Sequence, residues 1–181
     1  MEFEEIFIRG AFVIKPGVFG DDRGYFFESF RKDEFEANIG AVNFIQDNES
    51  KSSAGVLRGL HFQKGKYAQA KLVRVIKGAV LDVIADIRPD SPTFGKYFAI
   101  ELTETNKLQL FLPRGMAHGF LVTENDTVFS YKVDNIYSPE NESGIIFNDP
   151  TLSIDWKLPE SSLLLSDKDK KLPLFDFLIE N

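Results

Sequence analysis

The sequence contains no cysteine and only two histidines, His61 and His118, among its 181 residues. Without cysteine, the chain has no disulfide framework, no thiolate metal site and no cysteine nucleophile. Most zinc and other transition-metal sites in proteins draw on cysteine and histidine, so two histidines make a poor ligand set. The sequence therefore argues against a disulfide-stabilised domain and predicts that the protein needs neither a metal nor another cofactor.

Long apolar runs and a basic surplus are also missing. No stretch approaches the roughly 20 apolar residues of a membrane-spanning helix, and the first five residues are acidic where a signal peptide would be basic. The formal net charge is −7 and the Lys and Arg residues are dispersed, which argues against nucleic-acid binding. We therefore expect a cytoplasmic protein that binds neither membranes nor nucleic acid.

Hydrophobic residues, by contrast, are plentiful. They make up 43% of the chain, and aromatic residues alone make up 13%, so a chain of 181 residues can form a substantial core. We find no linker, internal repeat or low-complexity segment. The sequence predicts a single domain over residues 1–181.

The clearest local pattern is strand alternation. Across residues 80–87, Leu81, Val83 and Ala85 alternate with Asp82 and Asp86, which is a period of two. Similar short runs, separated by turn-rich segments, cover residues 71–76, 97–102, 107–112 and 127–133. Regularly spaced short strands are typical of a sandwich or barrel. Helical spacing occurs only at residues 32–39, with a further short helix expected near the C-terminus.

Alternation also predicts which polar side chains face the interior. Tyr131 has the parity of Phe129 and Val133, and Lys71 has the parity of Val73. His61 lies in a neighbouring run of similar character. Burying polar groups costs free energy unless they find partners, so such groups inside an apolar barrel predict a ligand site.

Taken one at a time, these residues do not decide the function. His61 is equally compatible with a hydrogen-bonded structural histidine. Lys71 is compatible with a strand-end lysine whose ammonium is in water, and Tyr131 with a core residue. Asp167 and Asp169 have the pattern of a solvated charge cluster.

The segment at residues 113–120, which contains His118, matches the Pro-x-Gly-x-x-His element of cupins. Metal-binding cupins also need an earlier His-x-His and a glutamate. Here Phe62 and Gln63 follow His61, and Lys71 occupies the glutamate position. An ammonium group repels a divalent cation, so a metal-dependent oxygenase or isomerase is disfavoured.

A longer series of motifs runs through most of the chain in order, at residues 19–29, 46–48, 56–63, 68–75, 86–95, 113–120, 131–139, 148–150, 154–156 and 166–169. Over residues 10–175 the chain resembles the dTDP-4-dehydrorhamnose 3,5-epimerase family, a branch of the cupins. The resemblance implies an all-β, cupin-type jelly-roll barrel (double-stranded β-helix) with a few short helices. It also implies a homodimer, because the family pairs subunits through its sheets.

The resemblance implies a catalytic set. His61 would be the general base, oriented by Asp169, and Tyr131 the acid on the opposite face of the sugar. Lys71 would stabilise the enolate oxygen. A hydrogen beside a ketone can be removed only when the developing oxyanion meets a fixed cation or donor, and inversion needs a proton source on the other face. The residues alone do not distinguish Asp169 from Asp167 as the partner of His61.

The resemblance also implies the ligand contacts. Arg23 and Arg58 would bind a diphosphate through paired donors. The other implied contacts are Glu28, Gln46, Asp47 and Asn48 around the nucleoside, His118 near the sugar beside Lys71, Tyr137 stacked on thymine, and Glu142 and Lys168. The implied substrate is dTDP-4-dehydro-6-deoxy-D-glucose, a dTDP-linked 4-keto-6-deoxyhexose, converted to dTDP-4-dehydro-L-rhamnose in dTDP-L-rhamnose biosynthesis.

Two rival functions remain open at this point. One is an enzyme with the same machinery that inverts carbon 3 only, and one sequence does not separate the two outcomes. A non-catalytic sugar-nucleotide binding module would keep Arg23 and Arg58. It would have no need of His61, Lys71 and Tyr131 together, so their joint presence favours an enzyme.

Overall fold

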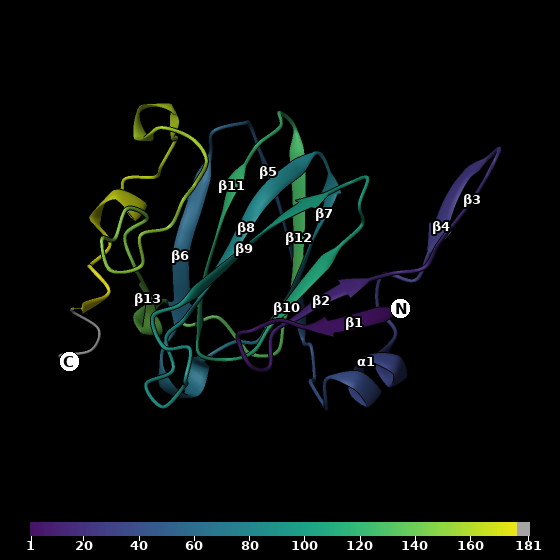
Figure 1. Cartoon of the computed structure of the whole chain (residues 1–181), viewed down its shortest axis with the longest axis horizontal. Coiled ribbons are helices and arrows are strands. Elements are labelled where there is room, and N and C mark those ends of the chain that lie inside the picture. The colour runs from purple at the N-terminus through teal and green to yellow at the C-terminus, as the bar shows by residue number, and fades with distance from the viewer. Residues whose placement is uncertain (177–181) are drawn as a thin grey trace.

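Two antiparallel sheets form a barrel in the computed structural model, which describes residues 1–176 (Figure 1). The six-stranded sheet has the order β1-β2-β10-β7-β12-β5, and the five-stranded sheet has the order β13-β6-β11-β8-β9. A separate two-stranded hairpin consists of β3 and β4. This arrangement confirms the predicted jelly-roll barrel.

The strands are β1 (Glu2–Glu5), β2 (Phe12–Lys15), β3 (Val18–Asp21), β4 (Gly24–Phe27), β5 (Gln46–Ser52), β6 (Leu57–Gln63), β7 (Lys71–Lys77), β8 (Ala79–Asp86), β9 (Tyr97–Thr103), β10 (Gln109–Leu112), β11 (Met116–Val122), β12 (Thr127–Val133) and β13 (Glu142–Gly144). The helical elements are α1 (Lys32–Asn38) and the 3-10 turns η1 (Gly65–Tyr67), η2 (Pro139–Asn141), η3 (Glu160–Ser162) and η4 (Asp169–Lys171). No helix within residues 1–176 is long and apolar enough to cross a membrane.

Most of the predicted elements are present. The predicted helix corresponds to α1, whose Phe35 packs edge-on against Phe111 of the six-stranded sheet. The run at residues 107–112 becomes a strand only from Gln109. Before it, the side chain of Asn106 accepts hydrogen bonds from the backbone of Thr103 and Leu108, which forms a turn instead of extended chain. Near the C-terminus the expected helix is present as the short 3-10 turns η3 and η4.

The strand β8 is buried on both faces, which the alternation did not predict. Val80 and Ile84 belong to the core inside the barrel, whereas Val83 belongs to a second core on the outer face of the sheet. Both Asp82 and Asp86 are fully buried. The outer face is covered by the C-terminal segment, which contributes apolar side chains such as those of Phe147, Leu152, Trp156 and Phe175.

The C-terminal segment then returns to the barrel beside β6. Leu164 forms a parallel bridge with Val56: its backbone N–H donates to the carbonyl of Gly55, and its carbonyl accepts from the N–H of Leu57. The residues that follow this pairing include η4, which contacts β6. In Figure 1 the segment lies on the side of the barrel opposite the β3–β4 hairpin, which projects away from it.

Candidate active site

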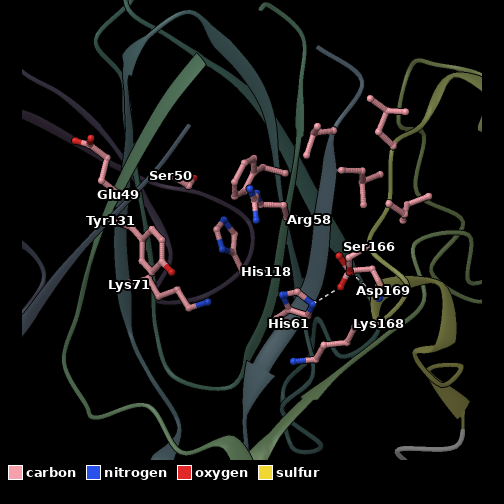
Figure 2. Close-up of a pocket in the computed structure, with 15 residues that line it drawn as sticks. Glu49, Ser50, Arg58, His61, Lys71, His118, Tyr131, Ser166, Lys168 and Asp169 are labelled. Atoms are coloured by element: carbon pink, nitrogen blue, oxygen red, sulfur yellow. Dashed lines mark hydrogen bonds and ion pairs between the residues drawn. The ribbon is translucent and has the colours of Figure 1, made fainter. Parts of the chain in front are cut away.

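Two adjoining cavities open into the barrel, with volumes of about 490 Å³ and about 300 Å³. Both are lined by His61, Lys71 and Tyr131. Figure 2 shows the larger one, in which polar side chains from the two sheets converge. Cavities of this size accommodate small organic ligands, so the predicted polar cluster lies in a pocket suited to one.

The close approach of β6 and β11 brings the two histidines together. In the antiparallel register His61 lies opposite His118, next to a bulge in the pairing. A Cβ atom on Gly59 would lie only 2.6 Å from the Cα atom of Gly119, and Gly59 also has a φ of +118°. Only glycine fits such a position. Gly59, two residues before His61, therefore allows β6 and β11 to pack closely.

His61 is hydrogen-bonded to Asp169 at 2.6 Å, between its Nε2 atom and a carboxylate oxygen (Figure 2). The side chain of Asp169 is 5% exposed, and its backbone N–H donates to the hydroxyl of Ser166. Burial acts to raise the pKa of Asp169, but the hydrogen bond and charge of His61 outweigh it and lower the pKa. Asp167 is 92% exposed and pairs with Lys170 instead. The geometry thus selects Asp169 over Asp167.

This dyad has the arrangement of an oriented base. A carboxylate that accepts the Nε2–H proton fixes the tautomer, so that Nδ1 of His61 carries the free lone pair. The ring is 29% exposed, on the side facing the pocket. The arrangement can therefore take a proton from a bound molecule and hold the resulting charge beside Asp169.

Lys71 and Tyr131 come from β7 and β12 of the opposite sheet. The Lys71 ammonium lies 5.8 Å from the centre of the Tyr131 ring. Burial lowers the pKa of Lys71 to about 8, although Asp82 and then Glu142 act in the other direction. Burial also raises the pKa of Tyr131, so its phenol keeps its proton at neutral pH. In Figure 2 these two side chains lie across the pocket from His61.

Two cations stand at the edge of the larger cavity. Arg58 on β6 donates to the hydroxyl of Ser52 at 3.1 Å, and Lys168 pairs with Glu142 at 2.5 Å. The same carboxylate accepts from the hydroxyl of Tyr137 at 2.5 Å. Both cations line the larger cavity, where a ligand can reach them. Glu142 contacts both Tyr137 and Lys168, and so links the segment around Tyr137 to the C-terminal segment.

The smaller cavity contains part of the predicted nucleoside set. Gln46 and Asn48 line it together with Tyr137. Asp47 does not, because successive side chains of a strand point to opposite faces. It is paired with Lys132 at 2.9 Å and lines a different depression on the outer side of the six-stranded sheet.

Two further predicted contacts lie outside both cavities. Arg23 sits at the turn of the β3–β4 hairpin, where its side chain is 90% exposed and paired with Asp21. Glu28 follows the hairpin and is paired with Arg31 at 3.5 Å. The chain does not bring either residue to its own pocket.

Asp82 was not among the predicted site residues. It is fully buried, and one of its carboxylate oxygens accepts a hydrogen bond from Nε2 of His118 at 2.9 Å. This bond fixes the ring of His118, which lines the pocket. The parity of Asp82 with Val80 and Ile84 was a usable signal, because both of those residues are apolar and face the barrel interior. Within residues 1–176, no group of three or more His, Asp or Glu side chains is arranged to hold a metal ion.

Comparison with known proteins agrees with this geometry. The family model of dTDP-4-dehydrorhamnose 3,5-epimerase matches residues 5–176. An Escherichia coli K12 protein of that name is 52% identical over 174 residues, which cover 95% of this chain and 93% of the relative.

Solved structures give the same result. The 3,5-epimerase from Elizabethkingia anophelis has a TM-score of 0.94 and 51% identity, covering 98% of this chain and 97% of that one. A 3,5-epimerase from Legionella pneumophila, in complex with dTDP-4-keto-L-rhamnose, has a TM-score of 0.93 and 43% identity, covering 97% and 93%. The chain described here belongs to the dTDP-4-dehydrorhamnose 3,5-epimerase family.

Proposed function

We propose that this protein inverts carbons 3 and 5 of dTDP-4-dehydro-6-deoxy-D-glucose to give dTDP-4-dehydro-L-rhamnose. The observation that carries the proposal is the His61–Asp169 dyad on one wall of a pocket whose opposite wall carries Tyr131 and Lys71. Inversion beside a ketone needs a base on one face, an acid on the other and a donor for the enolate oxygen. This pocket holds one candidate for each role.

The proton balance of the reaction is simple. His61 takes the proton from a carbon beside the C4 ketone, and the electron pair moves onto the ketone oxygen, where Lys71 stabilises it. Tyr131 then gives its phenolic proton to the same carbon from the other face. Carbons 3 and 5 both neighbour the ketone, so one set of groups can serve both once the ring is repositioned, solvent has taken the proton from His61 and a proton has returned to Tyr131. No redox step or cofactor is involved.

The residues that line the cavities indicate where the other parts of the substrate bind. The sugar lies between His61 and Tyr131 with His118 behind it. Arg58 and Lys168 at the edge of the cavity are suited to the diphosphate, because charge-assisted bonds from two cations match its oxygens. The smaller cavity then receives thymidine, with Tyr137 available to stack on the base and Gln46 and Asn48 available to bond to it.

Incubation of the purified enzyme with the 4-keto sugar nucleotide in deuterated water tests the proposal. We expect one deuterium at carbon 3, one at carbon 5 and inversion at both, as read by NMR. A 3-epimerase would label and invert carbon 3 without inverting carbon 5. A non-catalytic binding protein would bind the nucleotide sugar and label neither carbon, which would contradict the proposal.

We also propose that the protein acts as a homodimer. The β3–β4 hairpin projects from the barrel and exposes Phe19, Tyr25 and Phe26 by 71%, 60% and 67%. Three large apolar side chains on one projecting arm are costly in water and are typical of an interface. A second copy related by a two-fold axis would cover both arms reciprocally. Such an exchange would also place Arg23 at the pocket of the partner, since it does not reach its own.

A subunit-mixing experiment is a sharp check on this arrangement. Arg23→Ala and His61→Asn enzymes should each be nearly inactive at low substrate concentration. In a heterodimer, the site with intact His61 would receive the intact Arg23 of the other subunit. We therefore expect activity to reappear when the two variants are unfolded together and refolded, at up to about a quarter of the wild-type level for random pairing.

The control is a mixture of His61→Asn with Arg58→Ala. Arg58 lines the same pocket as His61 within one subunit. If Arg58 acts within its own subunit, every site in this mixture lacks either Arg58 or His61, so no activity should return, and the mixture sets the background level. If the Arg23→Ala mixture rises no higher than this background, Arg23 does not act across the interface.

A further inference from the structure

Asp82 is a fully buried carboxylate in the barrel interior whose charge is only partly accounted for by its contacts. Its Oδ2 atom bonds to Nε2 of His118 at 2.9 Å. Its Oδ1 atom is buried and, within the described part of the chain, is the only buried side-chain N or O atom without a hydrogen-bond partner. Leaving a charged oxygen unpaired in the interior is unfavourable, so a compensating charge nearby is expected.

His118 does not supply that charge. Burial lowers the pKa of His118, and the attraction of Asp82 opposes this without overcoming it. Nearby Lys71 and His61 lower it further. At neutral pH His118 is therefore a neutral imidazole that donates one N–H bond. The negative charge of Asp82 is held in position by His118 but is not cancelled by it.

Lys71 lines the same cavity as His118, to which Asp82 is bonded, and the charge of Asp82 acts on its ammonium. Asp82 is the strongest favourable influence on the Lys71 ammonium, ahead of Glu142, and it acts against the burial that lowers the pKa of Lys71 to about 8. The two residues come from opposite sheets, at the start of β7 and the middle of β8. They form no direct ion pair, and Lys71 remains free of any side-chain hydrogen bond in the described structure, so its ammonium is available to a ligand.

The surroundings of Lys71 contain few other sources of negative charge. The remaining ionisable groups that line the two cavities are Glu49, Arg58, His61, Tyr131, Tyr137, Glu142, Lys168 and Asp169. Asp169 is bonded to His61, and Glu142 to Lys168 and Tyr137. Glu49 is an exposed residue of β5, where solvent screens its charge.

We propose that Asp82 is a positioning residue of the site. One of its oxygens holds His118, and its negative charge keeps the Lys71 ammonium protonated inside the barrel. While no substrate is bound, the negative charge of Asp82 balances the positive charge of Lys71. When an enolate forms on a bound sugar, Lys71 is already cationic and free to meet it, so no proton has to be recruited from solvent. The catalytic consequence rests on the proposed function, whereas the electrostatic part does not.

The electrostatic part is tested without turnover, by NMR of protein labelled with ¹³C-lysine. The Lys71 signal is assigned by its absence in Lys71→Gln and titrated against pH. In Asp82→Asn the amide oxygen can still accept the His118 N–H bond, so the main change is the loss of charge. We expect the Lys71 titration midpoint to fall by about one to three pH units, because an opposite charge at close range typically shifts a titration by that much.

Asp86→Asn is the matched control. Asp86 lies on the same strand with the same parity and is equally buried, but its charge is neutralised by Arg88 at 2.7 Å. The Lys71 midpoint should not move in that variant. If Asp82→Asn fails to fold, Asp82→Ser retains a smaller acceptor for His118 and gives the same comparison. A Lys71 midpoint that stays in place in the folded Asp82 variant overturns the inference.

The catalytic consequence is read from the pH profile of kcat. Loss of the proton from Lys71 should remove activity as pH rises through about 8 in the wild type and at lower pH in Asp82→Asn, with the Michaelis constant little changed. At pH 8 a midpoint lowered by one unit leaves about a tenth of the sites charged instead of half, which corresponds to an activity loss of about fivefold. If the NMR midpoint moves and the activity profile does not, Asp82 still controls the charge of Lys71, and the role of Lys71 in the proposed reaction is wrong.

Discussion

Replacing His61 with asparagine is expected to abolish both deuterium exchange beside the ketone and epimerisation. Asparagine retains a hydrogen-bonding side chain of similar reach, but it cannot take a proton. The other imidazole in the pocket, that of His118, is hydrogen-bonded to Asp82 and is not part of the dyad. Loss of a general base typically lowers the rate by on the order of a hundred to ten thousand fold. Exchange and epimerisation both begin with proton removal, so both rates should fall together. The NMR assay in deuterated water measures both.

The carboxylates near His61 provide a graded comparison. Asp169→Asn should leave a folded protein with a misoriented or wrongly tautomerised His61, and therefore a much reduced rate. Asp167→Asn removes a carboxylate two residues away that is 92% exposed, so its effect should be small. A severe Asp167 variant beside a silent Asp169 variant would show that the 2.6 Å contact to His61 is not the one that matters.

Tyr131→Phe is expected to separate proton removal from inversion. The variant keeps His61 and Lys71, so a proton can still leave the substrate, exchange with solvent and return to the same face. What it loses is the proton donor on the opposite wall of the pocket. Epimerisation should fall by on the order of a hundred to ten thousand fold, while deuterium incorporation beside the ketone falls far less.

A parallel time course of deuterium incorporation and product configuration provides the measurement. The phenylalanine ring fills the position of the tyrosine ring, which lies 6.2 Å from that of Phe129, so the packing of the pocket should be retained. If exchange and inversion decline in the same proportion, Tyr131 is not a dedicated acid for the opposite face. It would then be needed for proton removal, for the enolate or for the shape of the site.

Strand parity predicted that Tyr131 and Lys71 face the barrel interior, where they line the pocket, but it did not predict the groups behind them. Tyr131 has the parity of Phe129 and Val133, and Lys71 that of Val73, and period-two alternation is a local property that a sequence displays directly. Asp82 was not predicted, because alternation in β8 shows that it faces away from Val83 and Ala85 but not which of the two faces lies inside the barrel. The face of Val83 and Ala85 is apolar because the C-terminal segment covers it from outside, and no local pattern of β8 reveals a cover that comes from residues 145–175.

The predicted ligand contacts also differ in whether they reach the pocket. Gln46 and Asn48 reach the pocket, and Asp47 between them does not, because a motif assigned as a block ignores the alternation of the strand that carries it. Arg23 is separated from the pocket by the geometry of a projecting hairpin. Whether such an arm reaches its own site or another molecule depends on tertiary and quaternary structure, which residue types do not encode locally.

The dyad joins two residues that are 108 positions apart in the chain. A ribosome makes the chain from its N-terminus, so His61 and every strand of the barrel are synthesised before Asp169. Until the last part of the chain emerges and pairs beside β6, the nascent protein carries a base without the carboxylate that orients it. A translation product interrupted before residue 169 therefore lacks the oriented base, and we expect it to act on the keto sugar at a much reduced rate at most.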